Sequence, residues 1–177
     1  LFSFTDGDFS GGTHLGTVGS GYMGAKDINV ALDQQDGFGT SVALNAAGNR
    51  MASGAYLDDG TGSDPTGNYG AVHLFSFEDT SFSGGRQVGI IGHGYTANNN
   101  LDVPIGGGTG AADWFGAAVA LNAAADRMAV GAWYDDGFGD SLDGSGAVYL
   151  FSFTDGNFSG GALEGVIGHG YGGGNNV

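Results

Sequence analysis

The chain of 177 residues contains no cysteine, only two prolines and only four lysines and arginines. The absence of cysteine excludes disulfides and thiolate metal sites. The four basic residues stand against 19 acidic ones, and the formal charge is −15. Because such a chain repels phosphates, this balance argues against nucleic acid or an anionic membrane as a partner. No stretch approaches the roughly 20 apolar residues of a membrane-spanning helix.

Glycine, in contrast, is abundant, with 39 residues, and the hydrophobic fraction of 41% is enough for a core. The glycines lack the every-third period of collagen and cluster between short apolar runs. This pattern predicts many tight turns and short strands. The excess of carboxylates attracts cations, and calcium is the cofactor we expect.

Nearly the same segment occurs three times. "LFSFTDGDFSGG" begins at Leu1, "GAVHLFSFEDTSFSGG" at Gly70 and "GAVYLFSFTDGNFSGG" at Gly146. Such spacing indicates a repeat unit of about 75 residues. We expect residues 1–15 to be the tail of a preceding unit, 16–88 unit 1, 89–164 unit 2 and 165–177 the start of another. The chain is therefore expected to be a piece of a longer protein.

Each unit contains four strand candidates separated by turn signals, and no segment shows a helical stripe. The candidates are 41–45, 50–56, 71–77 and 86–92 in unit 1, and 117–122, 127–133, 147–153 and 162–168 in unit 2. Residues 50–56 are small and apolar on both faces, which suits a strand covered on both sides. We therefore predict an all-β fold of propeller-type blades, each with four antiparallel strands.

Two segments carry a family resemblance: "FGTSVALNAAGNRMASGAYLDDG" and "FGAAVALNAAADRMAVGAWYDDG" resemble the FG-GAP repeat of integrin-α-type β-propellers, in its bacterial versions. The Phe-Gly and Gly-Ala pairs of the motif are present, and its proline is replaced. The matching positions are Phe38, Gly39, Gly54, Ala55 and Tyr56, and Phe115, Gly116, Gly131, Ala132 and Trp133. The resemblance implies a non-enzymatic segment of a secreted or cell-surface protein, acting in adhesion or in structural or filament assembly.

Calcium is expected at the acidic "DDG" loops, because calcium prefers several carboxylate oxygens on a glycine-bearing loop. The candidate ligands are Asp58, Asp59 and Asp64 in unit 1, and Asp135, Asp136, Asp140 and Asp143 in unit 2. The alternative is a solvated polar turn. The D-x-D-x-D-G calcium loop of many integrin-type blades is replaced here by "NAAGN" and "NAAAD", so that site is not carried over.

A carbohydrate-binding module is the alternative function. Its candidate ligand residues are Trp133, Tyr134, His93, Asn98 and Asn99, although asparagine and glycine are also ordinary loop residues. His73 is replaced by Tyr149 in unit 2, which predicts a tolerant surface position. Arg50 and Arg127 begin equivalent strands, and each is expected to pair with a carboxylate.

We find no nucleophile motif and no phosphate-binding loop with a lysine, so the chain is not expected to be an enzyme. An accessory subunit of a larger complex and an enzyme with its active site in other blades remain alternatives. Closed propellers typically have about four to eight blades. Further repeats or other copies of the chain are therefore the expected partners, in a ring or an open stack, together with glycans or surface proteins.

Overall fold

The computed structural model describes residues 1–61, 67–105 and 112–177, and these fold into strands and turns. The described residues contain no helix that could cross a membrane. The strands are β1 (Phe2–Ser3), β2 (Thr13–His14), β3 (Val18–Gly19), β4 (Ile28–Asn29), β5 (Phe38–Leu44), β6 (Arg50–Ala55), β7 (Ala71–Ser76), β8 (Arg86–Gly92), β9 (Leu101–Asp102), β10 (Phe115–Leu121), β11 (Arg127–Ala132), β12 (Ala147–Ser152) and β13 (Ala162–Gly168).

Two antiparallel sheets form the body of the molecule. Sheet 1 has the order β5-β6-β7-β8, with β9 added parallel to β8, and sheet 2 has the order β10-β11-β12-β13. The all-β fold and the four antiparallel strands of each unit are confirmed. Strands β5 and β10 begin at Phe38 and Phe115, before the predicted starts, because a bulge lets the Phe-Gly pair join each strand. β8 continues past residue 88 without a break.

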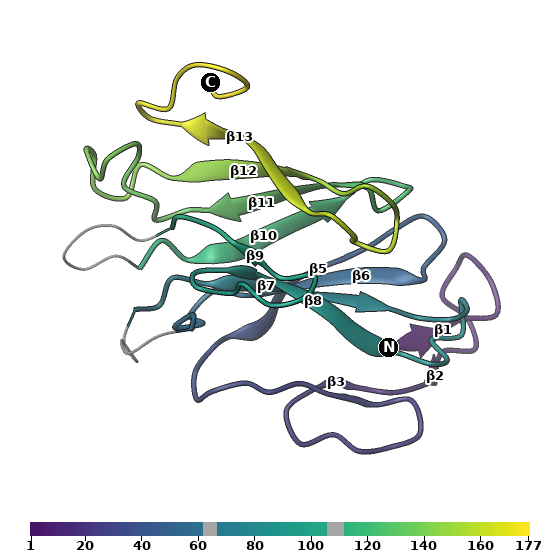
Figure 1. Ribbon diagram of the computed structural model, residues 1–177. Helices are drawn as coiled ribbons and strands as arrows, with labels where there is room; N and C mark the ends of the chain where they lie inside the picture. Colours follow the sequence, from purple (N-terminus) through teal and green to yellow (C-terminus); the bar gives the residue numbers. More distant parts are fainter. Residues whose placement is uncertain (62–66, 106–111) are drawn as a thin grey trace.

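The sheets are stacked in layers (Figure 1). The N-terminal segment, residues 1–32, forms the small pairs β1–β2 and β3–β4 and lies against one face of sheet 1. Sheet 2 covers the other face. One hydrophobic cluster lies between the N-terminal segment and sheet 1, and a second lies between the two sheets. The first includes Met51, Phe75 and Phe77, and the second includes Leu74, Phe115 and Phe151.

The Phe-Gly pair that begins β10 lies directly against sheet 1. Gly116 has a φ of +91°, and its carbonyl oxygen accepts a 2.6 Å hydrogen bond from the Ser41 hydroxyl. A Cβ atom on Gly54 would lie 1.9 Å from that oxygen. Phe115 is fully buried beside this contact. The Gly-Ala pair on β6 must therefore keep its glycine so that the next Phe-Gly pair can approach.

The repeated "FSGG" turns have a common internal structure. Oδ1 of Asp79 accepts hydrogen bonds from the amides of Ser81 (2.8 Å) and Ser83 (3.0 Å). These amide bonds lower the pKa of Asp79. Phe82 has a φ of +58°, and its ring packs edge-on against Phe77 at 5.0 Å. Asp6 and Asp155 make the same turns in the other two copies, which explains the close repetition of the segment.

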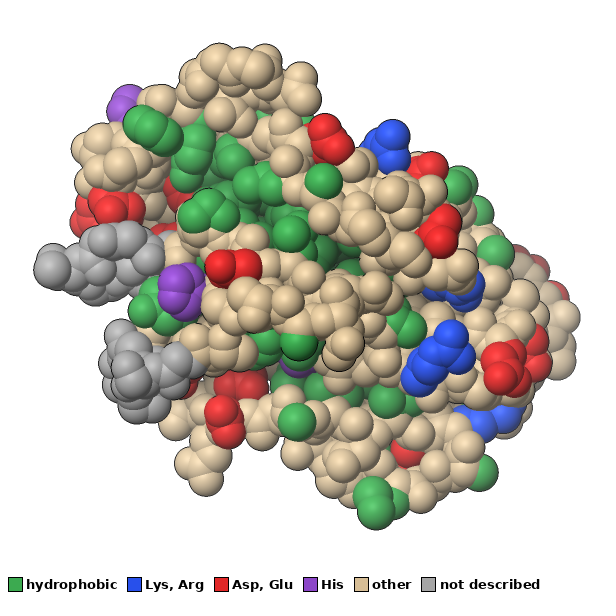
Figure 2. Space-filling model, in the orientation of Figure 1, with side chains coloured by type: hydrophobic (Ala, Val, Ile, Leu, Met, Phe, Trp, Pro, Cys, Tyr) green, Lys and Arg blue, Asp and Glu red, His purple; other side chains and the backbone are tan. Residues whose placement is uncertain are grey.

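The far face of sheet 2 is open, whereas the equivalent face of sheet 1 is covered. Val72 and Ile91 are both 0% exposed in sheet 1, but Val148 and Ile167, at the equivalent positions of sheet 2, are 38% and 43% exposed. Figure 2 shows hydrophobic side chains gathered over sheet 2. Full burial of such a side chain contributes about 1.5–3 kcal/mol of stabilising free energy, so covering this face would stabilise the molecule further.

Candidate functional site

Two equivalent clefts lie beside the acidic loops. Cleft 1, about 420 Å³, lies between the N-terminal segment and sheet 1, and cleft 2, about 440 Å³, lies between residues 93–105 and sheet 2. Both are lined by carboxylates and by tyrosine, one in cleft 1 and two in cleft 2, and their described linings contain no lysine or arginine. The polar lining includes Asp33, Asp36, Asp58, Asp59 and Tyr95 in cleft 1, and His93, Asp113, Asp135, Asp136, Tyr149 and Tyr171 in cleft 2.

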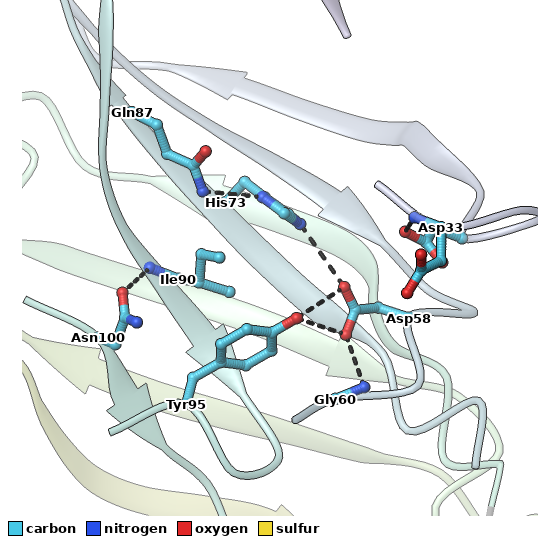
Figure 3. Close-up of polar contacts among 9 residues, drawn as sticks. Asp33, Asp58, Gly60, His73, Gln87, Ile90, Tyr95 and Asn100 are labelled. Carbon is cyan, nitrogen blue, oxygen red and sulfur yellow. Dashed lines mark hydrogen bonds and ion pairs between the residues drawn. The ribbon is translucent and has the colours of Figure 1, made fainter. Parts of the chain in front are cut away.

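Asp58 is the centre of cleft 1 (Figure 3). Its side chain is almost fully buried, at 5% exposure. Oδ1 accepts a 2.8 Å hydrogen bond from the amide of Gly60. The Tyr95 hydroxyl lies 3.0 Å and 3.1 Å from the two carboxylate oxygens. Burial raises the pKa of Tyr95 and the Asp58 charge raises it further, so Tyr95 remains a proton donor at all ordinary pH values.

His73 also faces Asp58. Its Nε2 lies 3.8 Å from Oδ2 of Asp58, and its Nδ1 lies 3.1 Å from Nε2 of Gln87. The side chain is 1% exposed, so the prediction of a tolerant surface position is wrong. The prediction of exposure came from the polar side chains at this position in both units, His73 and Tyr149. Polar side chains are usual at a surface, but here each points to a buried aspartate.

Asp135 is the centre of cleft 2 and is 2% exposed. Its oxygens accept hydrogen bonds from the Gly137 amide (2.8 Å), the Tyr149 hydroxyl (2.6 Å) and the Tyr171 hydroxyl (3.3 Å). Burial raises the pKa of Tyr149, and the hydrogen bond to Asp135 adds to the rise. The carboxylate of Asp135 is thus enclosed by donors from its own loop and from two tyrosines.

A second buried carboxylate lies in each cleft, and sequence analysis missed both. Asp36 and Asp113 are each 5% exposed. The amide of Asp33 donates a 2.7 Å hydrogen bond to Oδ2 of Asp36. Burial raises the pKa of Asp36, and the nearby charges of Asp58 and Asp33 act in the same direction. Both aspartates stand two residues before a Phe-Gly pair, a repeated position that could have identified them.

The predicted calcium ligands are only partly brought together. Asp58 and Asp59 line cleft 1, and Asp135, Asp136 and Asp140 line cleft 2, whereas Asp143 is exposed outside the described lining and Asp64 lies outside the described residues. The loops use several of these oxygens themselves: Asp59 accepts from the Asn68 amide and Asp136 from the Gly144 amide. In the described parts of the chain, no three His, Asp or Glu side chains are grouped to hold a metal. Calcium binding stays a prediction.

The predicted ligand residues lie in three separate places. His93 lines cleft 2, whereas Asn98 and Asn99 are exposed in the loop between β8 and β9. Trp133 and Tyr134 belong to an aromatic cluster instead.

The aromatic cluster is centred on Trp114. Its ring centroid lies 4.6 Å from that of Trp133, 4.9 Å from that of Tyr134 and 6.0 Å from that of Tyr56. Trp133 is 58% exposed. Trp114 holds a left-handed φ of +54°, where unit 1 has Gly37 at φ +67°. The change from "DGFG" to "DWFG" is the sequence signal of this cluster.

The two arginines behave differently, although they begin equivalent strands. Arg50 reaches from sheet 1 to sheet 2: its Nε donates a 2.8 Å hydrogen bond to the Gly156 carbonyl, and its Nη2 bonds to Oδ1 of Asn157. Its Nη1 also donates to backbone carbonyls, so its partners are carbonyls and an amide, and the expected pairing with a carboxylate is wrong for Arg50. Arg127 lies 3.9 Å from its neighbour Asp126, with 61% of its side chain exposed.

One segment of the chain matches a known protein family. Residues 107–151 match the family model of the FG-GAP repeat. The match includes the Phe-Gly pair at the start of β10, all of β11 and most of β12. No curated protein matches the chain. FG-GAP repeats are generally structural rather than catalytic, and they usually occur in extracellular or surface proteins. Residues 107–151 therefore match the FG-GAP repeat, which is consistent with an FG-GAP repeat protein.

Proposed function

We propose that this chain is a non-enzymatic structural segment of a secreted or cell-surface protein, acting in adhesion or extracellular assembly. The observation that carries the proposal is the stacking of sheet 1 on sheet 2 through the Phe-Gly and Gly-Ala pairs. A unit of this kind cannot bury both faces of its sheet alone, so stacking with neighbours supplies its core.

The stacked body is well suited to display loops at one end. Both acidic loops follow the ends of β6 and β11, and both clefts open beside them. In the view of Figure 2, Asp and Glu side chains lie on both sides, whereas the Lys and Arg side chains lie only on the right. A rigid support with a strongly acidic end is appropriate for a protein that presents contacts outside the cell.

Labelling with an antibody against the chain tests the location. The antibody should stain intact cells of the source organism, or detect the chain in the culture medium, before any lysis. Beads coated with the chain should also adhere to those cells more strongly than beads coated with the heat-unfolded chain. Staining that requires lysis would overturn the proposal.

Carbohydrate binding is a second candidate, favoured by the exposed aromatic cluster. The rings of Trp133 and Tyr134 present apolar faces to solvent beside acceptor groups of the acidic loop, an arrangement suited to stacking with sugar rings. Glycan binding that is lost in Trp133→Ala but kept in Phe138→Ala would support this function. Phe138 is a matched control because it is 63% exposed and lies outside the ring contacts of the cluster. Equal binding by both variants would exclude it.

A further inference from the structure

We propose that the open face of sheet 2 is a docking seat for the Phe-Gly corner of a second copy of this chain. The inference rests on the proposed assembly role and names its partner and its residues. The corner is Phe38 and Gly39 at the start of β5, and the seat is formed by Gly131 and Gly146 of sheet 2.

The seat already exists in an occupied form between the two sheets. Phe115 donates its amide proton to the Tyr69 carbonyl at 3.0 Å and pairs as a bridge with Gly70. A Cβ atom on Gly70 would lie 2.1 Å from the Phe115 carbonyl oxygen, as close an approach as that of Gly116 to Gly54. Two glycines of sheet 1 thus make room for the backbone of the next corner.

The same seat is present and empty on sheet 2. Gly131 and Gly146 stand at the positions of Gly54 and Gly70. A Cβ atom on Gly131 would meet only Ala118 of its own sheet, with the nearest atom at 3.3 Å, and one on Gly146 would meet only Trp133. Gly131 and Ala118 also line a groove of about 430 Å³ that extends to Thr40 and Tyr56 of unit 1.

The matching corner is free at the other end of the stack. Gly39 has a φ of +88°, close to the +91° of the docked Gly116, so the corner already has the bound conformation. A Cβ atom on Gly39 would meet nothing within 4 Å. Phe38 is half-buried, whereas the docked Phe115 is fully buried. Corner and seat lie on opposite ends of one chain, so copies would join head to tail, in a ring or a filament.

Docking requires the N-terminal segment to move aside. Residues 1–32 cover sheet 1 in the same way as residues 74–105 cover sheet 2. In the docked pair, residues 150–177 of one copy would take this position on sheet 1 of the incoming copy. Residues 1–12 and 150–161 differ only at Asp8 and Asn157, so the arriving segment can replace most contacts of the departing one. No strand of the N-terminal segment is hydrogen-bonded into sheet 1 among the described residues. The gain is the burial of the open face, as in domain swapping.

Light scattering on the full chain tests the docking seat. The wild-type chain should form multimers of the 17.6 kDa protomer as concentration rises. Gly131→Ala should weaken association at least about tenfold without unfolding the chain, because its Cβ atom blocks the seat while only Ala118 lies near it in the protomer. Gly7→Ala is the matched control, since a Cβ atom there meets nothing within 4 Å. It should associate like wild type.

Val148→Lys is a second variant on the same face and should also give monomers. A wild-type chain that remains at 17.6 kDa at its highest soluble concentration would overturn the inference. Association that is unchanged in both Gly131→Ala and Val148→Lys would do the same, because the contact would then lie elsewhere. An intracellular chain that associates through Gly131 would overturn only the proposed location and leave the docking seat intact.

Discussion

Tyr149 donates a 2.6 Å hydrogen bond to Oδ2 of Asp135, which is buried in the wall of cleft 2. In cleft 1 the equivalent residue, His73, faces Asp58 at 3.8 Å. Two different side chains thus serve one purpose, which is to cover a buried carboxylate at the start of an acidic loop. The loops are therefore anchored to the sheets through these aspartates.

Tyr149→Phe should lower the free energy of unfolding by about 1–3 kcal/mol, because it removes a donor from a buried carboxylate. The Gly137 amide and the Tyr171 hydroxyl remain as partners of Asp135, so the chain should still fold. Urea unfolding measures the change. Tyr134→Phe is the control: Tyr134 is 39% exposed, and its change should stay within about 0.5 kcal/mol. Equal effects would show that Tyr149 does not anchor the loop.

Arg50→Ala should cost about 2 kcal/mol, since it removes charge-assisted hydrogen bonds that join the two sheets. Arg127→Ala removes the same side chain from the equivalent strand, but its exposed ion pair contributes at most about 0.5 kcal/mol. Thermal unfolding of both variants gives a direct comparison. A smaller loss for Arg50→Ala than for Arg127→Ala would contradict the role of Arg50 between the sheets.

Asp36→Asn should stabilise the chain at neutral pH. The pKa of Asp36 is raised above its ordinary value of 3.8, so the folded state holds this proton more tightly than the unfolded state. The stability that Asp36 contributes is complete below 3.8 and is lost as pH rises through the raised pKa. The difference in Tm between Asp36→Asn and wild type should therefore grow from about pH 3 to about pH 8.

The Asp33 amide can still donate to Oδ1 of the new asparagine, so the geometry of the cleft is preserved. Asp140→Asn, which changes an exposed carboxylate, is the control. A Tm difference for Asp36→Asn that is constant with pH would contradict the raised pKa.

Calcium is predicted to bind the acidic loop of unit 2 and to raise the Tm of the chain. At about a hundred times its Kd, a bound ion adds about 2.7 kcal/mol. Asp140→Asn combined with Asp143→Asn should abolish the rise in Tm with calcium. These two carboxylates are exposed, and we expect them to supply calcium ligands beside those of Asp135 and Asp136. Melting curves in calcium and in EDTA that coincide for the wild type would leave the loops as solvated turns.

The long strands were predictable because alternation and turn residues repeat in both units. The pairs β1–β2 and β3–β4 were not, since two-residue strands carry no periodic signal. The bulge at Phe38 and Gly39 was also hidden, because the Phe-Gly pair does not by itself reveal that the strand register shifts there. The partners of Arg50 could not be predicted, because the Gly156 carbonyl lies more than a hundred residues away in sequence.

The candidate site was predicted less completely than the fold. The acidic loops were located, but composition alone could not distinguish Asp58 and Asp135, which are buried, from Asp140 and Asp143, which are exposed. Burial depends on which tyrosine or histidine the sheet brings to each aspartate. The sequence also did not show that Trp133 lies apart from Asn98 and Asn99. These residues belong to different loops of the repeat, and only the fold determines where each loop lies.

The Phe-Gly corner of one unit docks on the Gly-Ala pair of the unit before it. The most direct measurement is the stability of Gly54→Ala beside that of Gly131→Ala, the same change in an occupied and an empty seat. Gly54→Ala should lose at least about 3 kcal/mol, because its Cβ atom would lie 1.9 Å from the Gly116 carbonyl oxygen. Gly131→Ala should change the stability of the protomer by less than about 1 kcal/mol. Equal stabilities of the two variants would contradict the claim.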